Sequence, residues 1–576
     1  MKKLAKRITG KEWGMILLTV LFTCFSVYLE LEVPTYISEI TELIGTPGTE
    51  LGQLWSPAAK MMGLSLLAFL SSVTVGFFAS RVAASYTTHL RRDIFNRVLD
   101  FSQTEIKRFS IPSLLTRTTN DITQVQMLFT MGLQVVTRGP IMAIWAIGKI
   151  LGKSEYWLWA VVVAVIVNVL MTTVLITLAF PKQSVIQKLT DKLNSITRES
   201  LTGIRVVRAY NAEDYQDKKF EEANDEVTRL NLFVNRLMAI MNPIMMAISS
   251  GLTLAIYWIG AYIINDASLA ERLPLFSDMV VFMSYAMQVV MGFLLMGALF
   301  IVLPRTLVSA GRINQVLDLH SSIENPSHAQ TADPSVQGQV EFRDVTFRYS
   351  KNSEAVVEHV TFKAEAGQTV AFIGSTGSGK STLVNLLPRF YDVSAGEILV
   401  DGVNVQDYDL VDLHNKVGYI PQKAVLFSGD VKDNLDFGKS KETPLGEAAM
   451  WQALELAQSK NFIEDKEAGL ASEVAQGGTN FSGGQRQRLA IARALARKPE
   501  ILIFDDSFSA LDYKTDRILR QELAEKTKSM TKLIVAQRIS TIMDADLILV
   551  LDQGKVVGQG THKELLATNE VYQEIA

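Results

Sequence analysis

A glycine-rich segment in the second half of the chain has the spacing of a phosphate-binding loop. An apolar run over residues 369–373 precedes it, and a helical run from Leu383 follows it. In such a loop, backbone N–H groups close around nucleotide phosphates, a lysine adds positive charge, and a serine offers its hydroxyl to Mg²⁺. The residues expected to bind ATP are Gly374, Ser375, Thr376, Gly377, Ser378, Gly379, Lys380, Ser381 and Thr382.

A carboxylate suited to the same metal ion ends a second apolar run. Residues 501–504 are Ile-Leu-Ile-Phe, and Asp505 follows them. A buried strand that carries an aspartate at its carboxyl end places that side chain beside a phosphate loop, where it can hold Mg²⁺ through water. The motifs therefore predict Ser381 and Asp505 as metal residues.

The elements that must position these groups lie in residues 339–576. Residues 340–349 alternate like a half-buried strand, and strand–loop–helix punctuation continues to the end of the chain. Residues 321–338 are rich in Ser, Pro, Ala, Asp and Gln, which is typical of a linker. We therefore predict one α/β phosphate-loop domain over 339–576, joined by this linker to a different domain over 1–320.

The first 320 residues contain most of the long apolar runs of a chain that is 48% hydrophobic and 20% charged. A bilayer core of about 30 Å needs about 20 apolar residues in a helix. Six segments meet this condition and predict an α-helical membrane domain with long cytoplasmic extensions. The predicted spans are 13–40, 57–85, 127–151, 157–180, 238–264 and 276–303.

Basic residues near the helix ends predict the orientation of these spans. Residues 26–59 contain no Lys or Arg, whereas 86–121 and 181–236 contain many, so the first stretch should be external and the other two cytoplasmic. With six spans, both termini are then cytoplasmic. The basic amino end followed by an apolar run could mimic a secretory signal, but we interpret it as a retained helix in a bacterial cytoplasmic membrane.

A further motif gives the chain a resemblance to a known family. It consists of Phe481, Ser482, Gly483, Gly484 and Gln485, and it lies between the phosphate loop and Asp505. With this signature the chain resembles the ABC transporters over its whole length, in the half-exporter layout of six helices followed by one ATPase domain. The resemblance implies two such ATPase domains that close head to tail, with each ATP between one phosphate loop and the opposite signature.

The resemblance also assigns roles to other residues. It implies that Tyr349 stacks on adenine and that Gln422 lies at the metal and the coupling interface. It implies short coupling helices at the tips of the cytoplasmic excursions, near 104–112 and 210–217. The loop expected to touch the opposite subunit consists of Ser509, Ala510, Leu511 and Asp512.

Two positions depart from the family pattern. Asp506 stands where the family has the glutamate that serves as general base, and Gln537 stands where it has histidine. Losing one methylene withdraws a carboxylate by about 1.5 Å, and glutamine stays neutral where imidazole can be charged. Both changes affect the phosphate-loop side, whereas the signature is intact.

This asymmetry resembles the degenerate-site subunit of bacterial heterodimeric multidrug exporters. It implies a related half-exporter as partner, slow hydrolysis at this chain's own site, and an intact signature acting on the partner's ATP. A homodimer with slow ATPase activity is the alternative.

The substrate leaves a weaker pattern. Glu30 and Glu32 lie near the outer part of the first span, where charges are often functional. Met283 and Met287 belong to a spacing-four methionine series that suits varied apolar substrates. These residues suggest hydrophobic, cationic or drug-like amphipathic substrates beside membrane lipid, with helix packing as the plainer role. A lipid or peptide exporter, and a slow regulator or gated channel, are alternatives.

Charge and cysteine content exclude other classes. The net charge of −4 gives no basic field for nucleic acid. Cys24 is the sole cysteine, so no intramolecular disulfide and no zinc site built from several thiolates can form.

Overall fold

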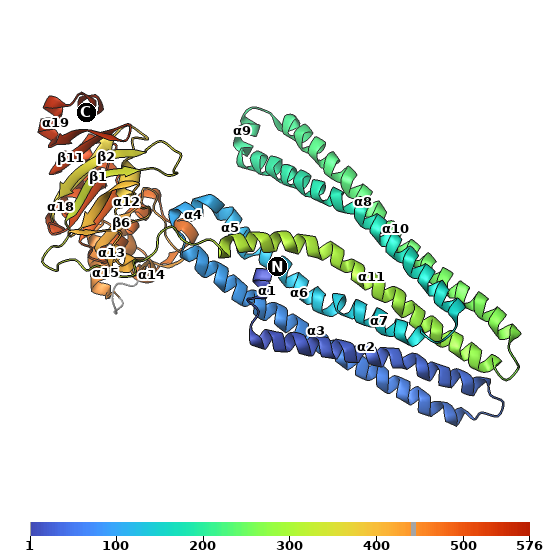
Figure 1. The fold of residues 1–576 in the computed structure, drawn as a ribbon. Coiled ribbons are helices and arrows are strands. Elements are labelled where there is room, and N and C mark those ends of the chain that lie inside the picture. Colours follow the sequence, from blue (N-terminus) through green and yellow to red (C-terminus); the bar gives the residue numbers. More distant parts are fainter. Residues whose placement is uncertain (1, 439–444) are drawn as a thin grey trace. The chain divides into compact units, whose positions relative to one another are not determined.

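The structure, a computed structural model, describes residues 2–438 and 445–576, and internal packing divides them into two units (Figure 1). The helical unit comprises Met1–Leu99 and Pro112–Leu319. The α/β unit comprises Asp100–Ile111 and His320–Ala576. Residues 100–111, which we expected within the first domain, therefore pack with the α/β unit.

Long helices build the helical unit, and a capping box formed by Thr9 and Glu12 starts the first of them. Its elements are α1 (Lys2–Ala5), α2 (Gly10–Gly45), η1 (Leu51–Leu54), α3 (Trp55–Leu99), α5 (Ile111–Thr118), α6 (Asn120–Met131), η2 (Gly132–Val136), α7 (Arg138–Ile150), α8 (Glu155–Thr202), α9 (Ile204–Ala209), α10 (Glu213–Asp266) and α11 (Arg272–Leu317).

Within the described residues, six helical stretches are long and apolar enough to cross a membrane, as predicted. They are Gly10–Gly45, Leu51–Leu99, Ile111–Ile150, Glu155–Ala179, Glu213–Asp266 and Arg272–Met296. The helices extend beyond the predicted spans because polar residues continue them. At 1.5 Å per residue, the 48 residues of α8 reach about 70 Å, far more than a bilayer core of about 30 Å.

The third stretch is interrupted near its middle. A short π-helical turn, η2, separates α6 from α7, and Pro140 lies in the first turn of α7. Proline cannot donate a hydrogen bond to the carbonyl four residues earlier, so an interruption at this place costs little. The turn lies just before Arg138, the first residue of α7.

The stretch predicted to be the second cytoplasmic excursion is the long hairpin of α8 and α10, joined by α9 (Figure 1). Gly203 ends α8, and Asn211 follows α9 with a φ of 49°, a conformation that asparagine tolerates. The predicted short helix near 210–217 is therefore misplaced: it spans residues 204–209, and α10 begins at Glu213. The first excursion turns at α4 (Gln103–Phe109), close to the expected 104–112, and Ser110 with a φ of 61° ends it.

The α/β unit is built on a mostly parallel sheet with the strand order β12-β11-β3-β10-β9-β6 and an antiparallel sheet with the order β2-β1-β4-β5. The strands of these sheets and of a small hairpin are β1 (Val340–Phe347), β2 (Val357–Ala364), β3 (Thr369–Gly374), β4 (Ala395–Val400), β5 (Val403–Asn404), β6 (Val417–Ile420), β7 (Gly429–Asp430), β8 (Glu473–Val474), β9 (Ile501–Asp505), β10 (Thr531–Val535), β11 (Leu547–Asp552) and β12 (Lys555–Gly560).

Helices and short helical turns surround these sheets. Besides α4, they are α12 (Lys380–Leu386), α13 (Leu410–Lys416), α14 (Val431–Leu435), α15 (Glu447–Leu456), α16 (Lys460–Glu464), η3 (Gly469–Ala471), η4 (Gln476–Gly478), α17 (Gly483–Ala496), α18 (Tyr513–Lys526), η5 (Ile539–Thr541), α19 (His562–Thr568) and α20 (Glu570–Ile575).

The parallel register brings the predicted site to one edge of the sheet. Strands β3, β10 and β9 are neighbours, and Val535 of β10 pairs with Phe372 on one side and Asp505 on the other. Side chains of β9 and β10 are buried, as expected for a sheet covered on both faces. The loop after β3, the carboxylates after β9 and the loop after β10 therefore meet at the carboxyl ends of the strands.

Candidate functional site

The predicted phosphate loop connects β3 to α12 and closes on its own lysine. Lys380 Nζ donates to the carbonyl oxygens of Gly374 at 2.8 Å and Ser375 at 2.7 Å. Burial lowers the pKa of Lys380, and the carboxylates of Asp506 and Asp505 oppose that shift. The ammonium group thus lies among backbone groups, in a place where phosphate oxygens can replace the carbonyls as partners.

The loop requires glycine where its backbone approaches another segment. Gly379 has a φ of 93°, and a Cβ there would lie 2.6 Å from the carbonyl oxygen of Val356. Any side chain would displace the first turn of α12. The neighbouring Gly377 has a φ of 89° but faces open space. The exposed rim of the loop consists of Ser375, Thr376 and Gly377, whereas Ser378 and Thr382 are buried.

Two of the three predicted metal residues, Ser381 and Asp505, lie next to each other, whereas the third, Gln422, donates to Asp506. Ser381 Oγ donates to Asp505 Oδ1 at 2.6 Å, and the hydroxyl of Tyr419 donates to Asp505 Oδ2 at 3.4 Å. Burial raises the pKa of Asp505, and the hydrogen bonds from Ser381 and Tyr419 partly offset this rise. Mg²⁺ prefers oxygen ligands and is usually held by one or two carboxylates together with substrate phosphates. A hydroxyl and a carboxylate in contact fit that requirement.

The altered general-base position, the altered histidine position and Gln422 also converge. Gln537 Nε2 donates to Asp506 Oδ2 at 2.7 Å, and Gln422 Nε2 donates to the same oxygen at 3.1 Å. Asp506 is 7% exposed and has a φ of 48°, and its backbone N–H donates to Val535. The shortened carboxylate is therefore held by two neutral amides at the bottom of the site.

The predicted adenine-stacking residue is part of an aromatic group. The hydroxyl of Tyr349 lies 2.9 Å from that of Thr382, and its ring meets the rings of Phe347 and Tyr391 edge-on. Lys107 of α4 places its ammonium group 4.5 Å from the centre of the Tyr349 ring and 5.2 Å from that of Tyr391. A hydrogen bond with Tyr391 raises the pKa of Lys107. Sequence reasoning missed Lys107, because its contact joins residues far apart in the chain.

The signature residues form the start of α17. Ser482 caps the helix: its Oγ accepts from the backbone N–H of Gln485, and Gln485 Oε1 accepts from the backbone N–H of Ser482. Phe481 is buried, whereas a Cβ added to Gly483 would meet nothing within 4 Å. The helix end is thus fixed in position, with open space in front of Gly483.

The predicted interface loop lies beside the signature. A Cβ at Gly484 would lie 3.4 Å from the carbonyl oxygen of Ala510 and 3.8 Å from Leu511. Ser509 Oγ donates to the backbone carbonyl of Asp506, and Asp512 caps α18 by accepting from the N–H of Thr515. In the described part of the chain, no hydrogen bond or ion pair joins residues 481–485 to residues 374–382.

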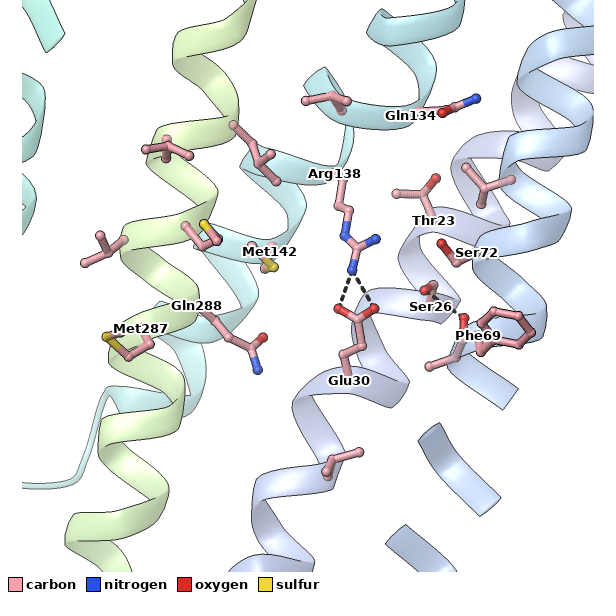
Figure 2. A pocket seen from close by; sticks show the side chains of 18 of the residues that line it. Thr23, Ser26, Glu30, Phe69, Ser72, Gln134, Arg138, Met142, Met287 and Gln288 are labelled. Carbon is pink, nitrogen blue, oxygen red and sulfur yellow. Dashed lines mark hydrogen bonds and ion pairs between the residues drawn. The ribbon is translucent and has the colours of Figure 1, made fainter. Parts of the chain in front are cut away.

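A cavity of about 1350 Å³ lies among the helices of the helical unit (Figure 2). We call it the membrane cavity; residues of α2, α3, α7, α10 and α11 line it, including Glu30 and Met287. Arg138 Nη2 donates to both carboxylate oxygens of Glu30, at 2.5 and 2.6 Å. Glu30, which we expected to meet a cationic substrate or water, is therefore already paired within the chain.

The other two candidate substrate residues lie elsewhere. Glu32 accepts a hydrogen bond from Lys149 Nζ at 2.6 Å, and neither residue is among the described residues that line the membrane cavity. Met283 is half-buried against the core of the helical unit. A role of these residues in substrate binding stays a prediction. Sequence reasoning missed Arg138 and Lys149, although two basic residues inside an apolar segment could have revealed them.

Comparison with known proteins agrees with this architecture. The family model of the ABC transporter transmembrane region matches residues 16–293, and the family model described as ABC transporter matches residues 357–509. An uncharacterized ABC transporter ATP-binding protein of Mycobacterium tuberculosis is 36% identical over 562 residues, which is 98% of this chain and 94% of that protein. An ATP-dependent lipid A-core flippase of Pseudomonas fluorescens is 32% identical over 507 residues, which is 88% of this chain and 82% of that protein.

A solved structure has the same fold. It is that of a bacterial Atm1-family ABC exporter with ATP bound, with a TM-score of 0.81, 23% sequence identity and 98% coverage of both chains. The chain is a multi-pass membrane protein that binds ATP, and it belongs to the ABC transporter family as an exporter whose ATPase activity is coupled to transport.

Proposed function

We propose that this chain is one half of a heterodimeric exporter in which its own ATP site hydrolyses slowly while its signature completes the partner's site. The observation that carries this proposal is the hydrogen bonding of the Asp506 carboxylate. Its Oδ2 atom accepts from both Gln537 and Gln422, at 2.7 and 3.1 Å. A general base needs a free lone pair within about 2.6–3.2 Å of the attacking water.

The side chains around Asp506 explain why its rate should be low. The carboxylate is about 1.5 Å shorter in reach than that of glutamate. Gln537 is neutral, so it brings no positive charge to a developing phosphate charge. Loss of general base catalysis costs roughly 10²–10⁴ in rate. Asp506 is still a carboxylate, so slow hydrolysis is expected rather than none.

The other residues of this chain's own site support tight binding of ATP there. Lys380 and the loop N–H groups hold the phosphates, Tyr349 offers a ring for adenine, and Ser381 with Asp505 would hold Mg²⁺. The ion, when bound, neutralises phosphate charge. This chain's contribution at its own site is therefore to bind ATP and keep the domains together.

The signature residues support a role at the second site. The capped start of α17 points its N–H groups and its helix dipole at open space in front of Gly483. A partner half-exporter that has glutamate and histidine would place its ATP there. Closure of the two domains on ATP would switch the helices to an outward-open state, and hydrolysis would reset them.

The substrates we propose are amphipathic or drug-like compounds carried out across a bacterial cytoplasmic membrane, with both termini of the chain inside. The methionines of the membrane cavity support this class, because methionine adapts to varied apolar shapes. A lipid substrate is the second candidate, favoured by the 32% identity to a flippase named for lipid A-core.

The test is phosphate release by the purified chain, alone and with a related half-exporter that has glutamate and histidine at the positions of Asp506 and Gln537. We expect ATP binding with very slow release alone, and rapid release after the partner is added. Rapid release by the single chain would contradict the proposal. Drug-like compounds and lipids, each added to the active pair, would separate the two substrate classes by the ATPase stimulation that they cause.

A further inference from the structure

The membrane cavity combines an apolar wall with one charged spot. Met142, Met287 and Met291 line it, and the charged pair Glu30–Arg138 reaches into it from α2 and α7 (Figure 2). The Glu30 and Arg138 side chains are 29% and 30% exposed, so both are open to a ligand. The spot is electrically neutral as a whole, but it offers a separate positive and negative end.

The geometry of the pair leaves hydrogen-bonding capacity on both sides. Only Nη2 of Arg138 contacts Glu30, and it bridges both carboxylate oxygens. A guanidinium has five N–H donors, and a carboxylate has about four acceptor positions. Within residues 2–438 and 445–576, no hydrogen bond engages Nε or Nη1 of Arg138. The pair can therefore receive an anionic group at Arg138 and a cationic group at Glu30 without separating.

Gln288 adds a third polar group to the same place. Its side chain points from α11 into the space that Glu30 and Arg138 enter from the other helices (Figure 2). Gln288 Oε1 is buried and has no hydrogen-bond partner among the described residues. An unpaired buried acceptor is unfavourable, and a rotation of the Gln288 amide toward the cavity would let an N–H group of a ligand satisfy it.

Charge balance decides which ligand fits. A cation at Glu30 would compete with Arg138 and add a net positive charge to an apolar cavity, and an anion at Arg138 would add a net negative charge. Both are costly where water is scarce. A head group with both charges leaves the cavity neutral, and its alkyl part would lie against the methionines.

We propose that the membrane cavity binds zwitterionic amphiphiles, with the anionic group on Arg138, the cationic group on Glu30, and an N–H donor, where present, on Gln288. The proposal rests on the proposed export of amphipathic compounds and narrows its substrate class. The head group can belong to a membrane lipid or to a free compound, since both present the same charges.

The chain contains a matched control pair. Glu32 and Lys149 join the same two helices through a 2.6 Å contact, and their side chains are 23% and 31% exposed. They are not among the described residues that line the membrane cavity. Glu32→Gln and Lys149→Gln therefore remove an ion pair of similar burial between α2 and α7 without changing the proposed site.

Binding is measured by calorimetry on the full chain in phosphatidylglycerol nanodiscs, with empty nanodiscs as the blank. The ligands share one alkyl chain: dodecylphosphocholine, dodecyltrimethylammonium and dodecyl sulfate, each below its micelle concentration. We expect dodecylphosphocholine to bind about tenfold or more tightly than either singly charged ligand. Its phosphate can accept charge-assisted hydrogen bonds from Arg138, and its quaternary ammonium, which has no N–H group, adds an ionic contact with Glu30.

Variants should change this preference in opposite directions. Glu30→Gln leaves Arg138 positive and unpaired, so the affinity for dodecyl sulfate should rise relative to that for dodecylphosphocholine. Arg138→Gln leaves Glu30 negative, so the relative affinity for dodecyltrimethylammonium should rise. Glu32→Gln and Lys149→Gln should keep the wild-type order. ATP binding and thermal unfolding are measured for each variant, and the order is compared among variants that match the wild type in both.

Two further arms identify the source of the head group. Phosphatidylethanolamine added to the nanodiscs should compete with dodecylphosphocholine if a two-chain lipid enters the cavity. Free phosphocholine, which has no alkyl chain, should bind at least tenfold more weakly, because it lacks contact with the methionines. Lack of competition by phosphatidylethanolamine would assign the site to single-chain or free compounds.

Equal binding of the three dodecyl ligands would overturn the proposal, and so would the same response to Glu30→Gln and Glu32→Gln. If the proposed export function is wrong but the binding proposal is right, the experiments give a different result. In that case the binding order would hold, but no amphiphile would stimulate the ATPase of the assembled exporter.

Discussion

Two regions of the α/β unit serve the same reaction but differ in what they require from this chain. The phosphate-loop edge is completed by internal contacts: Lys380 bonds to its own loop, Ser381 to Asp505, and Gln537 to Asp506. The signature at the start of α17 is held from behind by its capping box, and it faces open space at Gly483. The residues of the phosphate-loop edge are therefore held by contacts within this chain. The signature, in its proposed role, needs a nucleotide that another chain supplies.

The two positions that depart from the family pattern, Asp506 and Gln537, both lie in the first of these regions. At the edge, Gln537 Nε2 donates to Asp506 Oδ2, so these two residues form a hydrogen bond within the site. At the signature, Ser482 and Gln485 fix the helix end that another chain's nucleotide would meet. Under the proposed function, one domain would hydrolyse slowly at its own site and still complete the site of a partner.

The largest expected effect separates the two regions in the assembled heterodimer. Gly483→Asp puts a negative charge and a side chain into the open space before α17, and we expect a loss of roughly 10²–10³ in ATPase rate. Asp506→Asn alters the slow site and should lower the rate far less. Phosphate release with the wild-type partner measures both. Equal losses would show that the signature has no special role in the fast site.

A comparison of two glycines sharpens the contrast at the level of stability. Gly379→Ala places a Cβ against Val356 at a φ of 93°, so we expect a cost of about 1–3 kcal/mol in the free energy of unfolding. Gly483→Ala meets open space and should change it by less than about 1 kcal/mol. Thermal unfolding of the full chain checks this. A larger loss for Gly483→Ala would contradict the description of the signature.

Acidification should weaken the binding of Mg²⁺ at Asp505 before it affects other contacts of the nucleotide site. Burial raises the pKa of Asp505, and a protonated carboxyl is a poor ligand for Mg²⁺. Mg²⁺-dependent ATP binding should therefore weaken as the pH falls through this raised pKa, by about tenfold per pH unit, and at a higher pH than an ordinary aspartate with a pKa of about 3.9 would produce. Titrations of ATP binding with and without Mg²⁺ measure this, and in Asp505→Asn the effect should disappear.

The smallest expected effect concerns Lys107, which contacts the ring expected to stack on adenine. Lys107→Ala removes the cation from the Tyr349 and Tyr391 rings, a contact worth about 0.5–1 kcal/mol at an exposed site. ATP affinity should fall about twofold to fivefold. Lys107→Arg should keep it, and Arg108→Ala serves as the neighbouring control. An unchanged affinity in Lys107→Ala would mean that α4 does not influence the nucleotide site.

Much of this architecture was predictable because it rests on local patterns. The glycine spacing around Lys380, the apolar strand before Asp505 and the six apolar stretches each follow from periodicity or motif within a short window. The capping box at Ser482 is also local, because a serine followed three residues later by glutamine is a sequence pattern typical of a helix start, although we did not use it as a prediction.

Features that depend on distant contacts were not predictable in the same way. The pairing of Glu30 with Arg138 joins α2 to α7, and it changes the interpretation of Glu30 from a free carboxylate to half of an ion pair. Lys107 reaches Tyr349 across more than two hundred residues of sequence. The π-helical turn before Arg138 has no sequence signal except Pro140. The second tip was misplaced because the helix-ending role of Asn211 depends on a left-handed backbone that its sequence only permits.

The most direct test of the central claim restores the two altered residues in the single chain. Asp506→Glu with Gln537→His gives the edge a full-length base and an imidazole, while the signature of a second copy is already intact. We predict that the purified double variant, without any partner, releases phosphate about 10²–10⁴ times faster than the wild-type chain, and that adding Lys380→Ala abolishes the gain. A wild-type chain that is already as fast, or a double variant that binds ATP normally but is no faster, would contradict the account.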